Sequence, residues 1–351
     1  MNRRTSLFVA VALVLVIILA AVWRVQPRAQ PTSTTEIHVL IFGSNPLLLS
    51  VTHGLQNRFE ELDQAKRYKF VIHDAGFQTI NASSQARIAF SQKPAAVIAL
   101  GTPSIKAALP LRPKGTPFFF GATNDPEGLG LNVVASEDGK KSYTGSENIS
   151  GLVSEFNFEI MAELAILFGL ANGKASSITV GYPLNDHERN SVIAGDAIEA
   201  ALRKKGHNFF RAPVGETSQT GTATRTLISK GSDVIQLGPD NTVTGGIGGI
   251  LSAVNPMRTP VLASERESVA KGAACGVGID FKQLGNSLAD KVFASVVTEK
   301  HDPVSIAGFD AMCLYVNEHI AKELLSGTSQ RDLLQAFAER HKIALEAVKA
   351  K

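Results

Sequence analysis

Short apolar runs that end in small polar residues recur along the chain, and they constrain its fold more than any other feature. The clearest example is residues 234–242, VIQLGPDNT, where an apolar run stops at a Gly-Pro pair and a helical pattern follows. The same change recurs at Gly101–Ser104, Thr123–Pro126 and Leu262–Glu265. Polar residues at the carboxyl ends of strands build ligand sites in open α/β sheets. We therefore expect these strand tips to face one another across a cleft.

Strand and helix patterns alternate at the short spacing of βαβ units, which predicts parallel sheets with helices on both faces. The expected strands are residues 37–42, 68–73, 95–100, 116–123, 177–182, 207–213, 233–237, 260–263, 274–279 and 304–309. The expected helices are residues 47–62, 79–91, 103–109, 157–170, 187–205, 220–229, 242–254, 281–299 and 312–325.

A polar, Gly-rich stretch at residues 128–148 interrupts this alternation once. Two runs of βα units separated by one break predict an α/β fold with two similar lobes. The expected first lobe is 36–153 with 281–302, and the second is 154–280 with 303–328. Residues 329–351 are charged, and we expect them to form a C-terminal helical appendage.

The first 30 residues have the pattern of an export signal or a membrane anchor. Met1–Arg4 is short and basic, and Leu7–Trp23 is an unbroken apolar run closed by Arg24 and Arg28. At 1.5 Å per residue the run reaches roughly 25 Å, against a bilayer core of about 30 Å. Cleavage and retention of this segment both remain open. Either outcome places the rest of the chain outside the cytoplasmic membrane, in the periplasm or its equivalent.

The net charge and the cysteine content limit the classes of function that this chain can have. The net charge of +3 arises from arginines of the first 30 residues, which carry no Asp or Glu, so the rest of the chain is near neutral. Without a basic stripe, nucleic acid is not an expected partner. Cys275 and Cys313 match no metal spacing; they could pair in an oxidising compartment or remain buried thiols.

Six segments in order along the chain carry a family resemblance. They are AAVIALGTPSIKAA (95–108), FFFGATNDPEGLGL (118–131), NISGL (148–152), NDHERNS (185–191), QLGPDNTV (236–243) and TPVLASERESVAKGAACGVGIDFKQLG (259–285). Together they resemble the exported substrate-binding proteins of ABC transporters, in the branch with tryptophan- and tyrosine-binding members. The resemblance covers about residues 36–325.

The resemblance implies a type I periplasmic binding fold with two Rossmann-like lobes, three hinge crossings and a ligand in the cleft. It also implies a partner permease with its ATPase. The chain departs from the family pattern at three places. It lacks the lipid-anchor cysteine, its loop before Asn148 is longer and lacks Pro-Gly-Gly, and Glu265 stands where the family has Asp.

The candidate ligand-binding residues are polar side chains at the strand tips. They are Ser44, Asn45, Thr102, Ser104, Asn124, Asp125, Asn190, Asp240, Asn241, Ser264 and Glu265. The three acidic residues could accept from an ammonium group, and Thr102 and Ser104, with helix N–H groups, could hold a carboxylate. Each residue could instead cap a helix or begin a turn.

We found no catalytic or metal motif in the sequence. It has no G-x-S-x-G elbow, and His187 and Glu188 do not form H-E-x-x-H. We therefore expect no cofactor, no metal and no enzymatic activity. The leading hypothesis is an exported protein that closes over a small polar, amino-acid-like ligand. The alternatives are a membrane-anchored sensor domain with the same fold and an exported hydrolase.

Overall fold

The computed structural model describes residues 34–64, 67–136, 141–145, 149–171, 176–255, 258–298, 306–325 and 330–349. The predicted export or anchor segment lies outside these residues. Within them, no helix combines the length and the hydropathy needed to cross a membrane.

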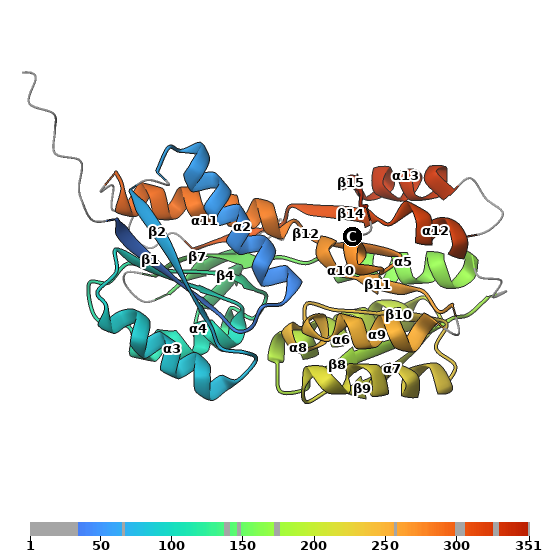
Figure 1. Cartoon of the computed structure of the whole chain (residues 1–351). Helices are drawn as coiled ribbons and strands as arrows, with labels where there is room; N and C mark the ends of the chain where they lie inside the picture. The colour runs from blue at the N-terminus through green and yellow to red at the C-terminus, as the bar shows by residue number, and fades with distance from the viewer. Residues whose placement is uncertain are drawn as a thin grey trace, which may run out of the picture.

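The first lobe is built on a six-stranded parallel sheet, at the left in Figure 1. Its order is β13-β7-β4-β3-β1-β2. The strands are β1 (Thr35–Ile41), β2 (Tyr68–Asp74), β3 (Ala96–Leu100), β4 (Phe118–Thr123), β7 (Ile149–Ser154) and β13 (Ile306–Phe309). Helices α2 (Pro46–Glu61) and α11 (Phe281–Val296) cover one face, and α3 (Thr79–Ser91) and α4 (Thr102–Ala108) cover the other. Two 3₁₀ turns follow α4 and β4, η1 (Leu109–Leu111) and η2 (Glu127–Leu129).

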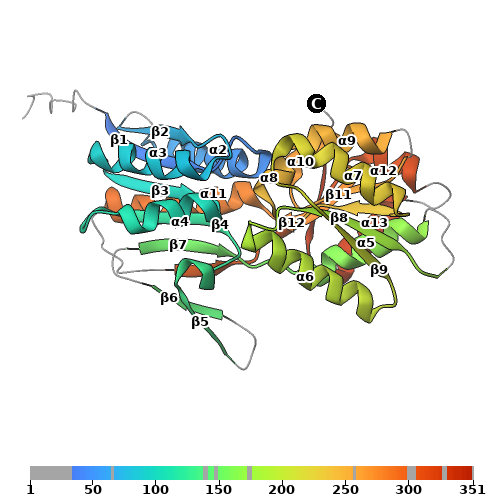
Figure 2. The ribbon, with the colours of Figure 1, turned by 90° about the horizontal axis from the view of Figure 1, so that it is seen from below.

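The predicted interruption contains a two-stranded antiparallel ribbon. It consists of β5 (Asn132–Ala135) and β6 (Lys141–Thr144), and it projects from the first lobe in Figure 2.

The second lobe is built on a seven-stranded sheet of order β15-β14-β12-β11-β10-β8-β9. Its strands are β8 (Thr179–Leu184), β9 (Asn208–Pro213), β10 (Val234–Gln236), β11 (Val261–Ala263), β12 (Cys275–Ile279), β14 (Met312–Val316) and β15 (Ala344–Ala347). One core packs against α5 (Phe158–Ala171), α6 (Arg189–Lys204), α12 (Glu318–Leu324) and α13 (Gln330–His341). The other packs against α7 (Thr220–Ser229), α8 (Asn241–Gly245), α9 (Ile247–Val254) and α10 (Arg266–Lys271), with η3 (Thr217–Gln219) before α7.

Three crossings in the described chain connect the lobes: β7 to α5, β12 to α11, and β13 to β14. Backbone hydrogen bonds join these segments, from Glu155 N to Phe309 O and from Asp280 N to Ala311 O, both 2.9 Å. The predicted fold class, two Rossmann-like α/β lobes of the type I periplasmic binding architecture, is confirmed.

The helix expected at residues 312–325 is wrong. Met312–Val316 forms β14, which pairs antiparallel with β12, and a short helix, α12, follows it. A strand buried on both faces of a sheet has a continuous apolar run, which periodicity does not separate from a buried helix.

The C-terminal helical appendage is also a wrong prediction. Helix α13 buries Leu334 and Phe337, and β15 then pairs in parallel with β14 at the edge of the second sheet. Val348, just after β15, is 4% exposed. The C-terminal segment is therefore part of the second lobe's core.

The predicted lobe boundary after residue 302 needs one correction. Residues Ile306–Phe309 form β13, which pairs with β7 in the sheet of the first lobe, whereas the prediction placed 303–328 in the second. The chain passes to the second lobe only after Phe309, at the third crossing.

Two smaller predictions concern helix 242–254 and the cysteines. The helix is divided at Gly246 into α8 and α9. Helix α9 packs closely on α7, because a Cβ at Gly221 would lie 3.1 Å from the Gly249 carbonyl oxygen.

Cys275 and Cys313 are both buried and free.

Candidate functional site

The loops that face each other across the two lobes lie at the topological switch points of the two sheets. In the first sheet β1 and β3 are neighbours, and the chain continues from them to opposite sides; β8 and β10 have the same relation in the second sheet. Ligands bind at such points in open α/β sheets, beyond the carboxyl ends of the strands.

The lobes touch across these loops through polar contacts. Asn45 Nδ2 donates to Asn241 Oδ1 at 3.0 Å, and Asn124 Nδ2 donates to the Asn190 carbonyl at 3.4 Å. Arg189 of the second lobe pairs with Asp125 of the first, with 3.0 Å between Nε and Oδ1. The structure therefore shows the two lobes in a closed arrangement.

Beside these contacts lies a cavity of about 560 Å³, which we call the cleft cavity. The first lobe contributes Phe42, Gly76, Phe77, Gln78, Thr79, Ser83, Thr102, Pro103, Lys106 and Ala107. The second lobe contributes Asn185, His187, Glu188, Arg189, Asn190, Gly215, Glu216, Thr217 and Thr242. The cavity thus has walls from both lobes, side chains of both charge signs and two aromatic rings.

The ring of Phe77 bridges the two lobes at this cavity. It meets Phe42 edge to face, with 6.0 Å between ring centroids. A Cβ at Gly43 would lie 2.6 Å from the Phe77 ring, and one at Gly245 of the second lobe would lie 2.7 Å from it. Glycine at both positions therefore lets the ring fit between the lobes.

Thr102 and Ser104 begin α4, where they were predicted to hold a carboxylate. Thr102 lines the cleft cavity, and its hydroxyl shares a 2.8 Å hydrogen bond with that of Thr123. Ser104 is buried, and its Oγ has no hydrogen-bond partner among the described residues. Thr102 alone of the pair reaches the cavity.

Asn124 and Asp125 follow β4, and the carboxylate of Asp125 forms hydrogen bonds and ion pairs with other residues of the protein. It accepts from Gly128 N at 3.0 Å and pairs with Lys106 at 3.3 Å as well as with Arg189. Asp125 therefore joins the lobes and is not free to accept a ligand's ammonium group. Asn124 lies at a small cavity between the lobes.

Asn190 reaches both the small cavity and the cleft cavity. Its Nδ2 donates to the Pro239 carbonyl at 2.6 Å, whereas its buried Oδ1 has no partner among the described residues. An unpaired buried acceptor costs free energy unless something donates to it. Asn190 is thus the predicted residue with the clearest unused hydrogen-bonding capacity.

Asp240 was the strongest sequence candidate, yet it lies wholly inside the second lobe. Its Oδ1 caps α8 by accepting from Val243 N at 2.8 Å, and Oδ2 accepts from Asn185 N and the Ser191 hydroxyl at 2.7 and 2.5 Å. Burial, reinforced by nearby Glu188, raises its pKa to about 7. The capping alternative fits Asp240.

Its neighbour Asn241 faces the first lobe. Besides accepting from Asn45, it donates from Nδ2 to Glu188 Oε2 at 2.7 Å. Asn45 itself caps α2, because its Oδ1 accepts from Leu48 N at 2.8 Å. The two asparagines connect the helix starts of the two lobes.

The three remaining candidates lie away from the cleft cavity. Ser264 is buried with its hydroxyl unpaired, and Glu265 caps α10 through Ser268 N at 3.1 Å. Burial raises the pKa of Glu265 to about 8. Ser44 is exposed and donates to Asp74 at 2.5 Å.

Glu188 is the main site residue that the sequence analysis missed. It is 6% exposed, and its carboxylate accepts from the backbone N–H groups of Asn241 and Thr242 at 3.3 and 3.2 Å. The Thr242 hydroxyl donates to it at 2.7 Å. The sequence analysis tested Glu188 only as part of a metal motif, and in the described residues no group of His, Cys, Asp and Glu could hold a metal ion.

Lys106, Arg189, Phe42 and Phe77 were missed as well. One sequence signal could have identified Phe77, because a Gly-Phe pair lies three residues after an expected strand, at a position similar to the other strand tips. No comparable sequence signal marks Lys106 and Arg189, because each residue lies within the first turns of a helix.

Comparison with known proteins agrees with the fold. The family of ABC transporter substrate-binding proteins matches residues 36–341. A tyrosine-binding protein of Clostridioides difficile is 26% identical over 234 residues, 67% of this chain. The match spans 64% of that relative, just under two thirds of its length.

Solved structures of similar fold cover nearly all of the chain. An ABC domain from Streptococcus pneumonia, in complex with L-Trp, has a TM-score of 0.72 at 19% identity and covers 89% of this chain and 100% of that one. A conserved domain protein from Vibrio cholerae has a TM-score of 0.71 at 25% identity, covering 90% and 100%. The chain belongs to the family of ABC transporter substrate-binding proteins.

Proposed function

We propose that this protein captures a small zwitterionic, amino-acid-like ligand in the cleft cavity and delivers it to the permease of an ABC transporter. Capture would involve hinge closure about the three crossings and no chemical step. We further propose that it acts outside the cytoplasmic membrane, as its first 30 residues suggest.

The observation that carries this proposal is the combination of opposite charges in one interlobe cavity. Lys106 and Arg189 pair with Asp125, and a ligand carboxylate would compete with Asp125 for them. Among the described residues, Glu188 accepts only from neutral donors and so keeps its negative charge, and it and Glu216 can attract an ammonium group. Phe42 and Phe77 add an apolar wall that suits an apolar or aromatic side chain. The similarity to a tyrosine-binding protein supports the same ligand class.

A thermal-shift panel on ligand-stripped protein tests the proposal. The protein would be unfolded and refolded to remove carried ligand, then melted with amino acids, small peptides, sugars and purines. A ligand at a hundred times its Kd adds about 2.7 kcal/mol, a shift of a few degrees at this chain length. We expect shifts with amino acids only; a shift with sugars or purines alone would overturn the ligand class.

Two variants, Thr102→Ala and Ser44→Ala, test whether the ligand binds in the cleft cavity. Thr102→Ala removes a hydroxyl at the cleft cavity and should reduce the amino-acid shift. Ser44→Ala, on an exposed serine outside the cavity, should leave it unchanged. Equal shifts in both variants would place the ligand elsewhere.

A further inference from the structure

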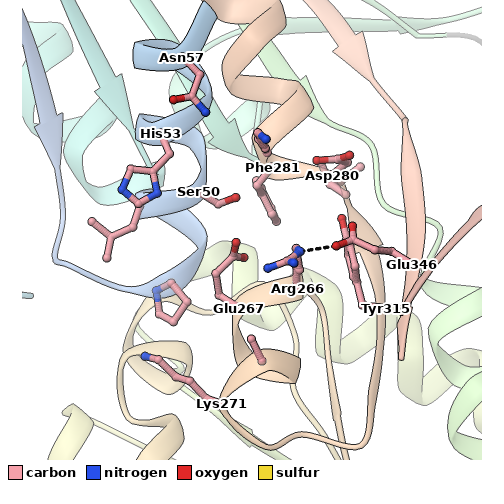
Figure 3. A pocket seen from close by; sticks show the side chains of 15 residues that line it. Ser50, His53, Asn57, Arg266, Glu267, Lys271, Asp280, Phe281, Tyr315 and Glu346 are labelled. Carbon is pink, nitrogen blue, oxygen red and sulfur yellow. Dashed lines mark hydrogen bonds and ion pairs between the residues drawn. The ribbon is translucent and has the colours of Figure 1, made fainter. Parts of the chain in front are cut away.

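A second interlobe cavity, which we call the hinge-side cavity, has no part in the proposed capture of the transported ligand. Its volume is about 570 Å³. It includes Ile279–Lys282, where the chain crosses from β12 to α11, whereas the cleft cavity contains no crossing residue. Figure 3 shows Ser50 and His53 of α2 on one wall and Arg266 and Glu267 of α10 on the other.

This cavity is lined by three Lys or Arg side chains and three Asp or Glu side chains, which are unequally paired. Arg266 forms an ion pair with Glu346 of β15, with 2.5 Å between Nε and Oε1. Glu267 faces Ser50 in Figure 3, and its buried Oε2 has no hydrogen-bond partner among the described residues. The Lys271 side chain extends away from Glu267 in Figure 3. An unpaired acceptor therefore lies beside the cavity.

Asp280 supplies a second carboxylate to the same space. One of its oxygens caps α11 by accepting from Gln283 N at 2.9 Å. Burial, with a smaller contribution from Asp280, raises the pKa of Glu267, as expected for a carboxylate without a full counter-charge. The rings of Phe281 and Tyr315 add apolar surface next to these carboxylates.

We propose that the hinge-side cavity is a second binding site, for a small organic amine with an apolar tail. The ammonium group would donate to Glu267 and Asp280, and the tail would pack on Phe281 and Tyr315. Because Ser50 and Glu267 belong to different lobes, the amine would favour the lobe arrangement that brings them together.

Isothermal titration calorimetry of the purified full-length protein tests this site with phenethylamine. The neutral control is 2-phenylethanol, which has the same shape but no positive charge. We expect saturable binding of the amine at millimolar or lower concentration and no binding of the alcohol over the same range. Equal binding of the two compounds, or no amine binding, would overturn the proposal.

Matched variants locate the amine. Glu267→Gln should weaken its binding at least tenfold, and Asp280→Asn, which keeps a helix-capping side chain, should also weaken it. Glu216→Gln removes a carboxylate from the cleft cavity instead, and it should leave amine binding unchanged. Loss in Glu216→Gln with retention in Glu267→Gln and Asp280→Asn would contradict the proposal, whatever the cleft cavity binds.

Discussion

Asn190, Glu188 and Asp240 all follow strands of the second lobe, but they have different places in the site. Of the three, only Asn190 and Glu188 line the cleft cavity. Asp240 instead satisfies backbone and hydroxyl donors inside the second lobe. We therefore expect Asp240 to stabilise the site, and we propose Asn190 as a ligand contact.

The buried carboxyl of Glu265 predicts a measurable pH dependence. Its pKa of about 8 in the folded protein exceeds its ordinary value of 4.5, so the folded state holds the proton more tightly. The free energy of unfolding should therefore fall as pH rises through this interval. Between pH 5 and pH 8 the wild type should lose about 3 kcal/mol more than Glu265→Gln, measured by urea unfolding.

The control for this titration is Glu216→Gln, which removes an exposed carboxylate. Its unfolding free energy should follow that of the wild type across the same pH range. A Glu265→Gln variant with the full wild-type pH dependence would show that Glu265 does not titrate in this interval.

At the scale of single residues, sequence reasoning found the strand tips but not their roles. Polar residues after strands were identified correctly because the apolar runs mark where each strand ends. Whether such a residue caps a helix or faces a ligand depends on where the opposite lobe lies, and Asp240 and Asn241 differ in this although they are adjacent. Glu188 was missed because its main partners, Asn241 and Thr242, are more than 50 residues away in sequence.

At the scale of elements, Phe77 of the first lobe lies against helix α8 of the second, and we expect this contact to limit closure. In Gly245→Ala the new Cβ would lie 2.7 Å from the Phe77 ring, but only when the lobes are closed. Overpacking of this kind costs about 1–3 kcal/mol. We expect ligand affinity to fall by roughly that amount, measured by calorimetry with the amino acid identified in the panel.

Gly248→Ala is the matched control for this variant. Gly248 lies in α9, and a Cβ there would meet nothing within 4 Å. Its ligand affinity should equal that of the wild type. Equal affinities in Gly245→Ala and the wild type would mean that Phe77 moves aside without cost.

The C-terminal elements α13 and β15 stabilise the second lobe. Phe337 of α13 is 1% exposed, and large-to-small changes at such phenylalanines cost about 3–5 kcal/mol. We expect Phe337→Ala to lower the free energy of unfolding by that amount in urea. Gln335→Ala, an exposed change in the same helix, should have little effect, and a similarly small effect of Phe337→Ala would restore the appendage interpretation.

At the scale of elements, the alternating pattern predicted most strands and helices, and two helices, α3 and α7, have the predicted bounds. The failures lie at the C-terminal side of the chain. Met312–Val316 is a buried run without alternation, and β15 is a short strand of mixed polarity that is recognisable only through its partner β14. Strand pairing of this kind is a tertiary property, which local periodicity does not contain.

For the molecule as a whole, the Arg189–Asp125 pair holds the two lobes together. Arg189 is about half exposed, so its loss should weaken closure by roughly 1 kcal/mol, a fivefold shift toward the open form. Small-angle X-ray scattering of ligand-free Arg189→Ala should give a larger radius of gyration than the wild type. Arg203→Ala breaks a pair with Glu199 within α6 and should leave the radius unchanged.

The central claim is that a small zwitterion binds between the lobes, and one calorimetric comparison tests it most directly. Stripped wild-type protein and Asn190→Ala would be titrated with L-tyrosine and L-tryptophan. We predict binding of one ligand per chain by the wild type and at least tenfold weaker binding by Asn190→Ala, because Asn190 offers an unpaired acceptor to the cleft. Unchanged affinity in Asn190→Ala, or no binding of either amino acid to the wild type, would contradict the account.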